Sequence, residues 1–237
     1  MNENRKHGDV MQTKSYENLF DKYIQEKNIY ESVVLVEREP GETVFSNAYG
    51  GKDIDSPIIA ASITKMFTAA CVFILVQQGF ITLHDSLLNF YEPAYLKGLH
   101  FYKGKDYSYD LKISDLLYQT SGLADIYEEG RNSIKKQVII SDTCITFDKK
   151  ILDMKQYRKL QLSMFPIYYG SGYMRIKMGG FSTSFLGQGD LIGHSGSTGS
   201  FAFYYPSKEL FFVGDFNQMK YPSLPIRFVM QLAMFAP

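Results

Sequence analysis

The chain has 237 residues, 45% of them hydrophobic, and its 25 basic and 25 acidic side chains leave no formal net charge. That length and apolar content are enough for a substantial core, so one domain, or one domain with a small satellite, is the expected organisation. The balanced charge argues against nucleic acid, a polyanion or an anionic membrane surface as a partner. The aromatic content of 15%, all of it Tyr and Phe, favours an antiparallel sheet.

The first part of the chain predicts a helix followed by a β-hairpin. Residues 1–14 are polar and are expected to be disordered, whereas residues 15–27 place their apolar side chains on one helical face. Two runs rich in β-branched and aromatic residues, 32–38 and 42–49, flank a Pro-Gly turn signal and predict a hairpin. No apolar leader segment precedes the helix, which predicts a cytoplasmic protein, or an extracytoplasmic one if a leader was removed.

An apolar helix is predicted next. Residues 66–76 are apolar on all sides, which is typical of a buried helix rather than a surface helix. The stretch is too short to span a bilayer, so no membrane segment is predicted. Shorter helical patterns follow at residues 114–122 and 149–162.

The last part of the chain changes to strands. They are predicted within residues 168–178, 190–196, 200–206 and 209–217, and an apolar helix over residues 226–235 closes the chain. Strands from the two ends of a chain can form one antiparallel sheet with helices on its faces. The predicted fold class is therefore α+β.

Ser62 and Lys65 form the first candidate site, a Ser-x-x-Lys motif at the start of the apolar helix. Residues three apart on a helix share a face, so the lysine amine is expected beside the serine hydroxyl. Serine needs a base to become a nucleophile, and lysine can act as that base when a dry environment lowers its pKa. The N-terminal end of the helix also offers unpaired N–H groups to an oxyanion.

The same motif has an ordinary structural interpretation, in which Ser62 only caps a core helix. A second match, from Ser133 to Lys136, illustrates how readily the pattern occurs by chance. The two matches differ in setting, because Ser62 begins a long apolar helix directly after a hairpin, whereas Ser133 lies in a polar stretch.

The second candidate site is the Gly- and Ser-rich segment LIGHSGSTGS, residues 191–200. Glycines at the end of a strand let a ligand approach the backbone closely. His194 is suited to donate or relay a proton or to bind a carboxylate, and the N–H of Ser197 is suited to contact a carbonyl oxygen. The alternative is a Gly/Ser-rich turn with an incidental histidine, and the segment alone does not decide between the two.

Together and in this order, the motifs resemble the β-lactamase-like serine hydrolases and penicillin-binding proteins, in particular the branch of class C β-lactamases, D,D-peptidases and related esterases. The resemblance rests on the hairpin before SITK and on the phrases LVQQGFITLHDSL, LLYQTSGLAD, PIYYGSGYMRIKM and GHSGSTGSFAFYYPSKELFFVGDFNQ. It covers roughly residues 15–125 and 147–235. It implies a single domain over residues 15–237, with an α/β part (15–60 and 165–237) and a reduced helical part (61–164).

The resemblance implies acyl transfer. Ser62 would attack a carbonyl carbon to form an acyl-enzyme, Lys65 would help to remove the serine proton, and the N–H groups of Ser62 and Ser197 would form the oxyanion hole. The family's Lys-Thr-Gly or His-x-Gly triplet is occupied here by His194, Ser195 and Gly196. Histidine in the first place of the triplet occurs more in peptidases, esterases and uncharacterised members than in true β-lactamases, which leans against antibiotic hydrolysis.

One family element has no counterpart in the sequence. The family carries a Tyr-x-Asn element whose tyrosine partners the lysine in proton transfer, and the nearest remnant here is ISDT at residues 140–143, with Ile140 in the tyrosine place. The alternative is that residues 137–146 are only a splice across a deletion. Four tyrosines without the motif around them remain as substitutes: Tyr127, Tyr157, Tyr168 and Tyr169.

The predicted function is that of a serine hydrolase acting through an acyl-enzyme on an amide, peptide or ester, impaired if no residue replaces the missing tyrosine. The alternatives are a non-catalytic penicillin-binding-like sensor and a degenerate pseudoenzyme. A small molecule or peptide is the expected substrate, and no cofactor is expected. No metal site is expected either, because the four histidines are scattered singly. The oligomeric state is not predicted.

Overall fold

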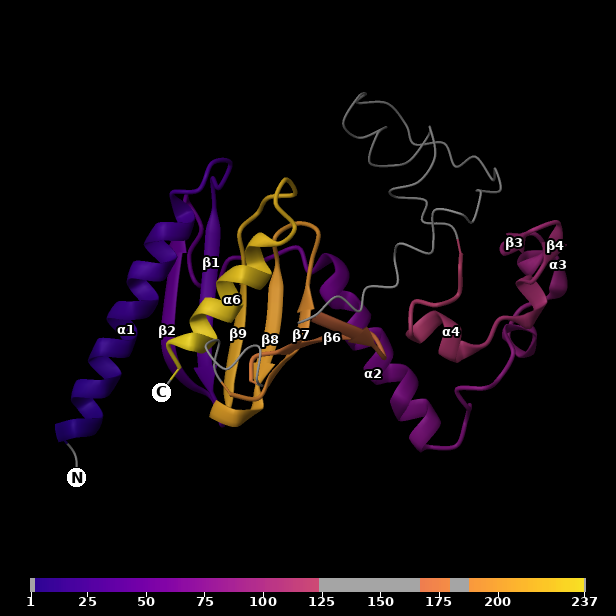
Figure 1. Ribbon diagram of the computed structural model, residues 1–237, viewed down its shortest axis with the longest axis horizontal. Helices are drawn as coiled ribbons and strands as arrows, with labels where there is room; N and C mark the ends of the chain where they lie inside the picture. The colour runs from indigo at the N-terminus through magenta and orange to yellow at the C-terminus, as the bar shows by residue number, and fades with distance from the viewer. Residues whose placement is uncertain (1–2, 124–166, 180–187, 237) are drawn as a thin grey trace. The chain divides into compact units, whose positions relative to one another are not determined.

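A computed structural model of the chain describes residues 3–123, 167–179 and 188–236, with side chains from residue 13 onward (Figure 1). The chain divides into two compact units, one formed by Met1–Ala70 with Ser163–Pro237 and the other by Cys71–Leu162. We call them the sheet unit and the second unit. The predicted boundary between the α/β and helical parts falls at residue 60, whereas the observed division follows Ala70. The organisation as a single domain stays a prediction.

The sheet unit is built on a seven-stranded antiparallel sheet with the strand order β2-β1-β9-β8-β7-β6-β5. The strands are β1 (Ser32–Arg38), β2 (Glu42–Tyr49), β5 (Ile167–Gly170), β6 (Tyr173–Lys177), β7 (Asp190–Ser195), β8 (Phe201–Tyr205) and β9 (Leu210–Asp215). Strands from the two ends of the chain meet at the β1–β9 pair, where Val33 lies opposite Asp215. The predicted α+β fold class, with an antiparallel sheet formed by N-terminal and C-terminal strands, is confirmed.

The segment predicted as one strand over residues 168–178 is a hairpin of β5 and β6. Gly170 pairs with Tyr173, and the two residues between them, Ser171 and Gly172, both have positive φ angles of 55° and 80°. Two positive φ angles in a two-residue loop are the geometry of a type I′ turn, which matches the twist of the strands that it joins. The turn at Ser171 and Gly172 therefore divides this run into two short strands.

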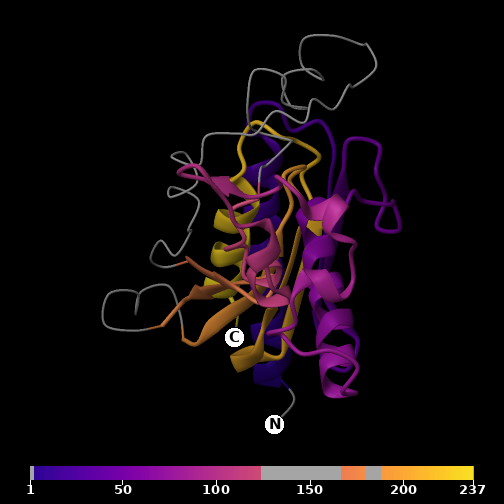
Figure 2. The same ribbon diagram turned by 90° about the vertical axis from the view of Figure 1, so that its right-hand side faces the viewer.

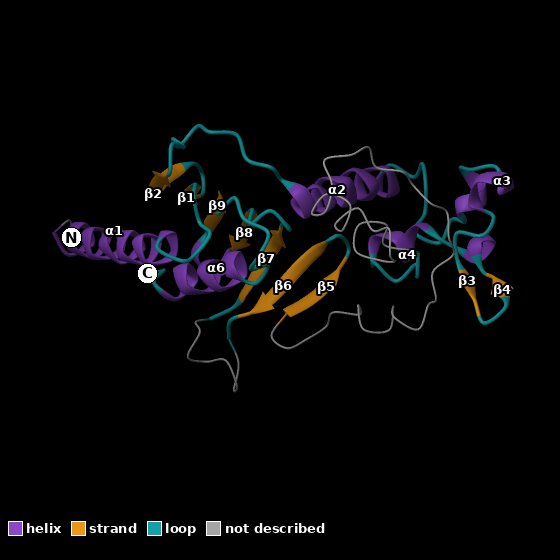
Figure 3. Ribbon diagram, turned by 90° about the horizontal axis from the view of Figure 1, so that it is seen from above, coloured by secondary structure: helices purple, strands orange, loops and turns teal. Residues whose placement is uncertain are grey.

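The core of the sheet unit lies between the sheet and two helices, α1 (Glu3–Ile24) and α6 (Leu224–Met234). Figure 3 shows the two helices near one another, and they are in contact. Phe228 of α6 is fully buried, with its ring 4.9 Å from that of Tyr23 on α1 and 5.0 Å from that of Phe216 after β9. These edge-to-face contacts join both ends of the chain in one aromatic cluster.

Helix α1 begins at Glu3 instead of the predicted Ser15. The expectation that residues 1–14 are disordered is therefore corrected from Glu3 onward. The apolar face that anchors the helix lies in its second half, where Tyr16 and Phe20 are buried. Extension of an anchored helix costs far less than nucleation of a new one, and most of the preceding residues are compatible with a helix. The periodicity located the anchored half only.

The apolar helix over residues 66–76 is present as part of α2 (Thr64–Gln77), preceded by the 3₁₀ turn η1 (Ala61–Ile63). The prediction that it is buried on all sides is wrong: among its residues only Ala69 is buried, and Phe67 is 65% exposed. An apolar composition favours burial of a helix, but it does not determine whether neighbouring elements cover that helix. Figure 2 shows this helix from the side, in purple.

After the last part of α2, from Cys71 on, the described part of the second unit consists of short elements. They are η2 (Leu87–Asn89), α3 (Pro93–Leu96), the paired strands β3 (Phe101–Tyr102) and β4 (Lys105–Asp106), η3 (Ser108–Asp110) and α4 (Ile113–Leu117). The helix predicted over residues 114–122 is thus shorter and ends at Leu117. Three buried leucines, Leu87, Leu96 and Leu111, form its cluster of buried apolar residues within the described part.

Candidate active site

Ser62 and Lys65 lie together at the start of α2, within the sheet unit. The Lys65 Nζ atom donates a hydrogen bond of 2.8 Å to the Ser62 Oγ atom, and both side chains are half-buried. The helical spacing of three residues produces this contact. The contact is the nucleophile–base geometry that an acyl-transfer serine requires.

The backbone around Ser62 has an unusual local conformation. Ala61, which directly precedes Ser62, has a positive φ angle of 46° and lies in the left-handed region. A residue with a side chain disfavours this region by about 1 kcal/mol, so the surrounding contacts must hold it there. Ile63 supplies one such contact, because its side chain is buried and its N–H donates to the Ala60 carbonyl.

The loop after β7 holds the chain just before Ser62 through two side-chain hydrogen bonds. The Thr198 hydroxyl donates to the Ile59 carbonyl at 3.0 Å, and the Ser200 hydroxyl donates to the Ala60 carbonyl at 3.1 Å. Gly196 allows this approach, because a Cβ atom on it would lie 2.8 Å from the Ala60 oxygen. The structure therefore brings the segment that contains His194 beside the segment that contains Ser62. Thr198 and Ser200 were not singled out from the sequence, since nothing in their spacing names a partner so far along the chain.

His194 is buried at the end of β7, with only 4% of its surface exposed. Its Nδ1 atom lies 2.6 Å from the Ser195 carbonyl oxygen, which can only accept, so Nδ1 is the donor and the neutral ring carries its lone pair on Nε2. Burial lowers the pKa of His194 below its usual value, the Ser195 carbonyl opposes this shift, and the charge of Lys65 adds to it. His194 is therefore neutral at pH 7.

The other residues predicted for the site differ in exposure. Ser195 and Gly196 are buried, whereas Ser197 is exposed in the turn that follows β7. Within the described residues, the N–H of Ser197 makes no hydrogen bond. An exposed, unpaired N–H beside the nucleophile's segment is suited to an oxyanion.

The β5–β6 turn packs against the first turn of α2. A Cβ atom on Gly172 would lie 2.9 Å from the Lys65 carbonyl oxygen and 2.5 Å from the Ala69 Cβ atom. Tyr169 lies two residues before Ser171 of this turn, with its ring 5.5 Å from the His194 ring and nearly perpendicular to it. The sequence named Tyr169 only as one of four tyrosines without a motif, and no spacing distinguished it.

Several sequence-based assignments lie outside the described residues. They are the remnant at residues 140–143, the proposed splice at 137–146, the helix at 149–162, Tyr127, Tyr157 and the second Ser-x-x-Lys match at 133–136.

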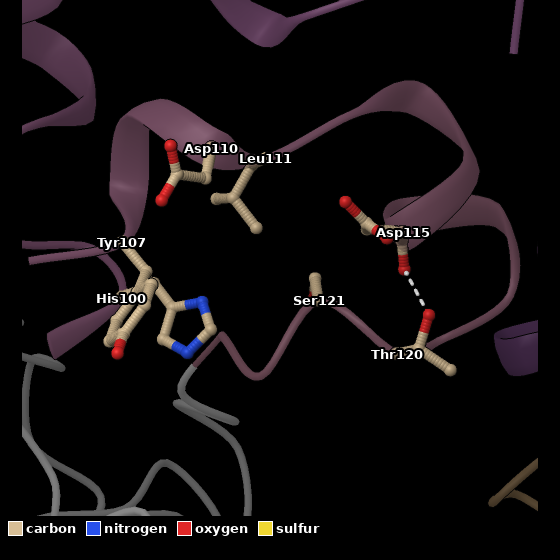
Figure 4. Close-up of a pocket in the computed structure, with 7 residues that line it drawn as sticks. All are labelled: His100, Tyr107, Asp110, Leu111, Asp115, Thr120 and Ser121. Atoms are coloured by element: carbon tan, nitrogen blue, oxygen red, sulfur yellow. Dashed lines mark hydrogen bonds between the residues drawn. The ribbon is translucent and has the colours of Figure 1, made fainter. Parts of the chain in front are cut away.

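A separate hollow of about 190 Å³ occurs within the second unit (Figure 4). It is lined by His100, Tyr107, Asp110, Leu111, Asp115, Thr120 and Ser121. None of the residues predicted for the site lines it. Within the part of the chain that the structure describes, no group of three His, Cys, Asp or Glu residues is arranged to hold a metal ion, and no helix there is long and apolar enough to cross a membrane.

Comparisons with known proteins found a family model and several similar folds. The family model described as Beta-lactamase matches residues 20–137. The fold is similar to that of "EstCE1, a hydrolase with promiscuous acyltransferase activity", with a TM-score of 0.62 and 13% identity over 96% of this chain and 99% of that one. It is similar to a β-lactamase/D-alanine carboxypeptidase from Pseudomonas syringae, with a TM-score of 0.57 and 12% identity over 96% of this chain and 99% of that one. It is also similar to a D-stereospecific amidohydrolase from Streptomyces sp., with a TM-score of 0.56 and 12% identity over 87% of this chain and 94% of that one. A comparison with curated proteins gave no match.

Proposed function

Because the chain belongs to the β-lactamase family over residues 20–137, we propose that it is a serine hydrolase that forms an acyl-enzyme on Ser62. Its substrate is a small molecule or peptide with an amide or ester bond. The single observation that carries the proposal is the hydrogen bond of 2.8 Å from Lys65 to Ser62. A buried or half-buried serine–lysine pair has this geometry when the lysine serves as the base.

The first chemical step follows from these atoms. The Ser62 Oγ atom attacks the carbonyl carbon of the substrate while its proton passes to Lys65, whose ammonium must first release a proton, and the carbonyl electron pair moves onto the oxygen. The N–H groups of Ser62 and Ser197 stabilise that oxyanion, a contribution typically worth about 3 kcal/mol per donor. The intermediate then collapses, the leaving group departs with the proton from Lys65, and an ester on Ser62 remains.

The names of the structurally similar proteins support the class of bond but not one substrate. One is described as a hydrolase with promiscuous acyltransferase activity, another as a D-stereospecific amidohydrolase and a third as a β-lactamase/D-alanine carboxypeptidase. Amides, peptides and activated esters are therefore the substrates to try first, and a histidine in place of the triplet's lysine favours the last two over β-lactams.

Intact-protein mass spectrometry tests the proposal. The chain is incubated separately with a β-lactam and with p-nitrophenyl acetate, and the mass is recorded after rapid acid quenching. We expect a mass increase of one acyl group with the ester, and its loss in Ser62→Ala and in Lys65→Met. Both variants remove one partner of the hydrogen bond and leave the sheet intact.

The chain provides its own matched control for this experiment. Ser133→Ala removes the serine of the second Ser-x-x-Lys match, and we expect it to acylate like the unmodified chain. Labelling that survives Ser62→Ala would overturn the assignment of the nucleophile. No labelling with either probe, combined with saturable binding that Ser62→Ala leaves unchanged, would favour a non-catalytic sensor instead.

A further inference from the structure

Tyr169 and His194 are neighbours, and each of them buries a polar side-chain atom. The Tyr169 hydroxyl and the Nε2 atom of His194 are both buried, and neither has a hydrogen-bond partner within the part of the chain that the structure describes. Their rings lie 5.5 Å apart at an angle of 84°. Buried polar atoms in native proteins almost always have partners, so two unpaired atoms on adjacent rings point to one shared ligand.

The two atoms have complementary hydrogen-bonding roles. Nδ1 of His194 donates to the Ser195 carbonyl, so Nε2 presents a lone pair and accepts. Tyr169 presents an O–H group, and because burial raises its pKa the hydroxyl stays protonated and donates. A molecule that donates to His194 Nε2 and accepts from the Tyr169 hydroxyl would satisfy both atoms. Water is the smallest molecule that does both.

The pair also lies close to the proposed nucleophile and its base. The positive charge of Lys65 acts on the His194 ring, and the β5–β6 turn that follows Tyr169 packs against the Lys65 backbone. All of these residues belong to the sheet unit. The strands that carry Tyr169 and His194 therefore adjoin the start of α2, where Ser62 and Lys65 lie: the β5–β6 turn packs on Lys65, and β7 contacts η1.

We propose that Tyr169 is a further catalytic residue, whose hydroxyl orients the water that hydrolyses the Ser62 acyl-enzyme while His194 Nε2 accepts a proton from that water. This inference rests on the proposed function. It gives the chain, on β5, a tyrosine for the hydrolytic step although the Tyr-x-Asn element is missing from the sequence.

The step balances in atoms and charge. The water oxygen forms a bond to the acyl carbon, one water proton moves to His194 Nε2, and the carbonyl electron pair moves onto the oxygen. When the intermediate collapses, the bond between the acyl carbon and Ser62 Oγ breaks. The neutral amine of Lys65 takes the proton from the imidazolium of His194 and, as an ammonium, gives a proton to the leaving Oγ. The products are the free acid and the original serine, lysine and histidine.

Stopped-flow kinetics with p-nitrophenyl acetate separates this step from acylation. The burst of p-nitrophenol reports acylation of Ser62, and the steady-state rate that follows reports hydrolysis of the acyl-enzyme. For Tyr169→Phe we expect the burst rate constant to stay within about twofold and the steady-state rate to fall about 10- to 100-fold, within the range of general acid–base effects. Hydroxylamine, a nucleophile that needs no base, is expected to restore turnover of the accumulated acyl-enzyme.

The neighbouring residue supplies the matched control. Tyr168 is adjacent on β5, and its ring stacks with the Arg175 guanidinium at 5.2 Å. Tyr168→Phe removes the same atom from the opposite side of the strand, and we expect both rates to be unchanged. His194→Gln provides a second route to the same result if Tyr169→Phe folds poorly, since it should also retain the burst and slow the hydrolysis.

The outcomes distinguish this inference from the proposed function. Absence of a burst in the unmodified chain would overturn both. A normal burst followed by unchanged hydrolysis in Tyr169→Phe or in His194→Gln would overturn the inference alone and leave Ser62 as the nucleophile. An equal loss of both rates in Tyr169→Phe, with a lowered melting temperature, would assign Tyr169 to packing and overturn its catalytic role.

Discussion

The two units of the chain are each stabilised by a different kind of internal contact. The sheet unit buries aromatic side chains from α1, α6 and the sheet in one continuous core. The described part of the second unit has a buried cluster of three leucines and forms its turns around carboxylates, as where Asp85 accepts from Thr82 and Asp106 accepts from Ser108. Core burial scales with apolar area, whereas a capped turn contributes about one hydrogen bond at a time. The difference indicates that, among the described residues, the sheet unit contributes most of the stability.

The same two regions also show what makes a histidine functional. His194 and His100 both have a buried ring nitrogen without a partner in the described residues. His194 lies beside a serine–lysine pair and a second unpaired donor. His100 lines the hollow of Figure 4 with Tyr107 and two aspartates, and among the described residues no nucleophile–base pair lies beside it. An unpaired histidine alone therefore does not identify a site. The neighbouring atoms that complete a reaction do.

The largest expected effect is the loss of an aromatic ring from the core of the sheet unit. Phe228→Ala removes the ring that contacts Tyr23, Phe201 and Phe216, and we expect a loss of about 3–5 kcal/mol in the free energy of unfolding. Urea denaturation followed by circular dichroism measures it. Phe235→Ala, at the exposed end of the same helix, should cost under about 1 kcal/mol. Similar losses in the two variants would contradict the core assignment.

The next effect concerns a buried ion pair in the sheet unit. Lys52 Nζ lies 2.8 Å from the Asp215 carboxylate, with 11% and 3% of their side-chain surfaces exposed. Lys52→Met leaves that carboxylate buried without its counter-ion, so we expect a loss of about 3 kcal/mol in the same measurement. Arg38→Met breaks the exposed pair with Glu42 and should cost under about 1 kcal/mol. A loss that small for Lys52→Met as well would mean that water solvates the Asp215 site.

The sequence predicted the fold best where local patterns decide the structure. The hairpin of residues 32–38 and 42–49 has the predicted bounds, because β-branched runs and a Pro-Gly turn act locally. The β5–β6 turn was missed although Ser171-Gly172 is a dipeptide common in turns, because strand-forming residues flank it closely on both sides. The prediction that α2 is buried was wrong because composition does not specify which elements cover a helix.

The candidate site divides in the same way. A spacing of three residues was enough to predict the contact between Ser62 and Lys65, because one helical turn brings them together. The positions of Tyr169, Thr198 and Ser200 at the site depend on strand order and on contacts between distant parts of the chain. Such contacts leave no periodic signal in a single sequence, so only the folded chain distinguishes Tyr169 from Tyr168.

A smaller effect is expected in the second unit. Leu111 is 4% exposed and packs with Leu87 and Leu96, so Leu111→Ala should cost about 2 kcal/mol, the low end for a buried leucine. Hydrogen exchange with peptide-level mass spectrometry should locate the loss of protection in residues 82–117, with the sheet peptides unchanged. Leu88, the neighbour of Leu87 in the sequence, is 40% exposed, so Leu88→Ala is the control and should alter protection little. Equal loss of protection in the sheet would show that the two units unfold as one.

The smallest effect is a pH dependence that differs between the units. The lowered pKa of His194 keeps the folded ring neutral while the unfolded ring gains a proton near pH 6.5, so the sheet unit loses stability as pH falls from about 6.5 towards that lowered pKa. Lys65 and Tyr169 are the titratable groups that face the ring within the described residues.

Hydrogen bonds from Thr82 and Ser108 lower the pKa values of Asp85 and Asp106. The stability that these two carboxylates contribute to the second unit is therefore present above about pH 4 and is lost as pH falls further. Hydrogen exchange, corrected for the intrinsic rate at each pH, should show the sheet peptides weakening first and residues 82–117 weakening only below about pH 4. His194→Gln should flatten the first change, and Asp85→Asn with Asp106→Asn should flatten the second, because asparagine keeps the cap without the charge. Weakening of both units over one pH range would remove the electrostatic part of the distinction between them.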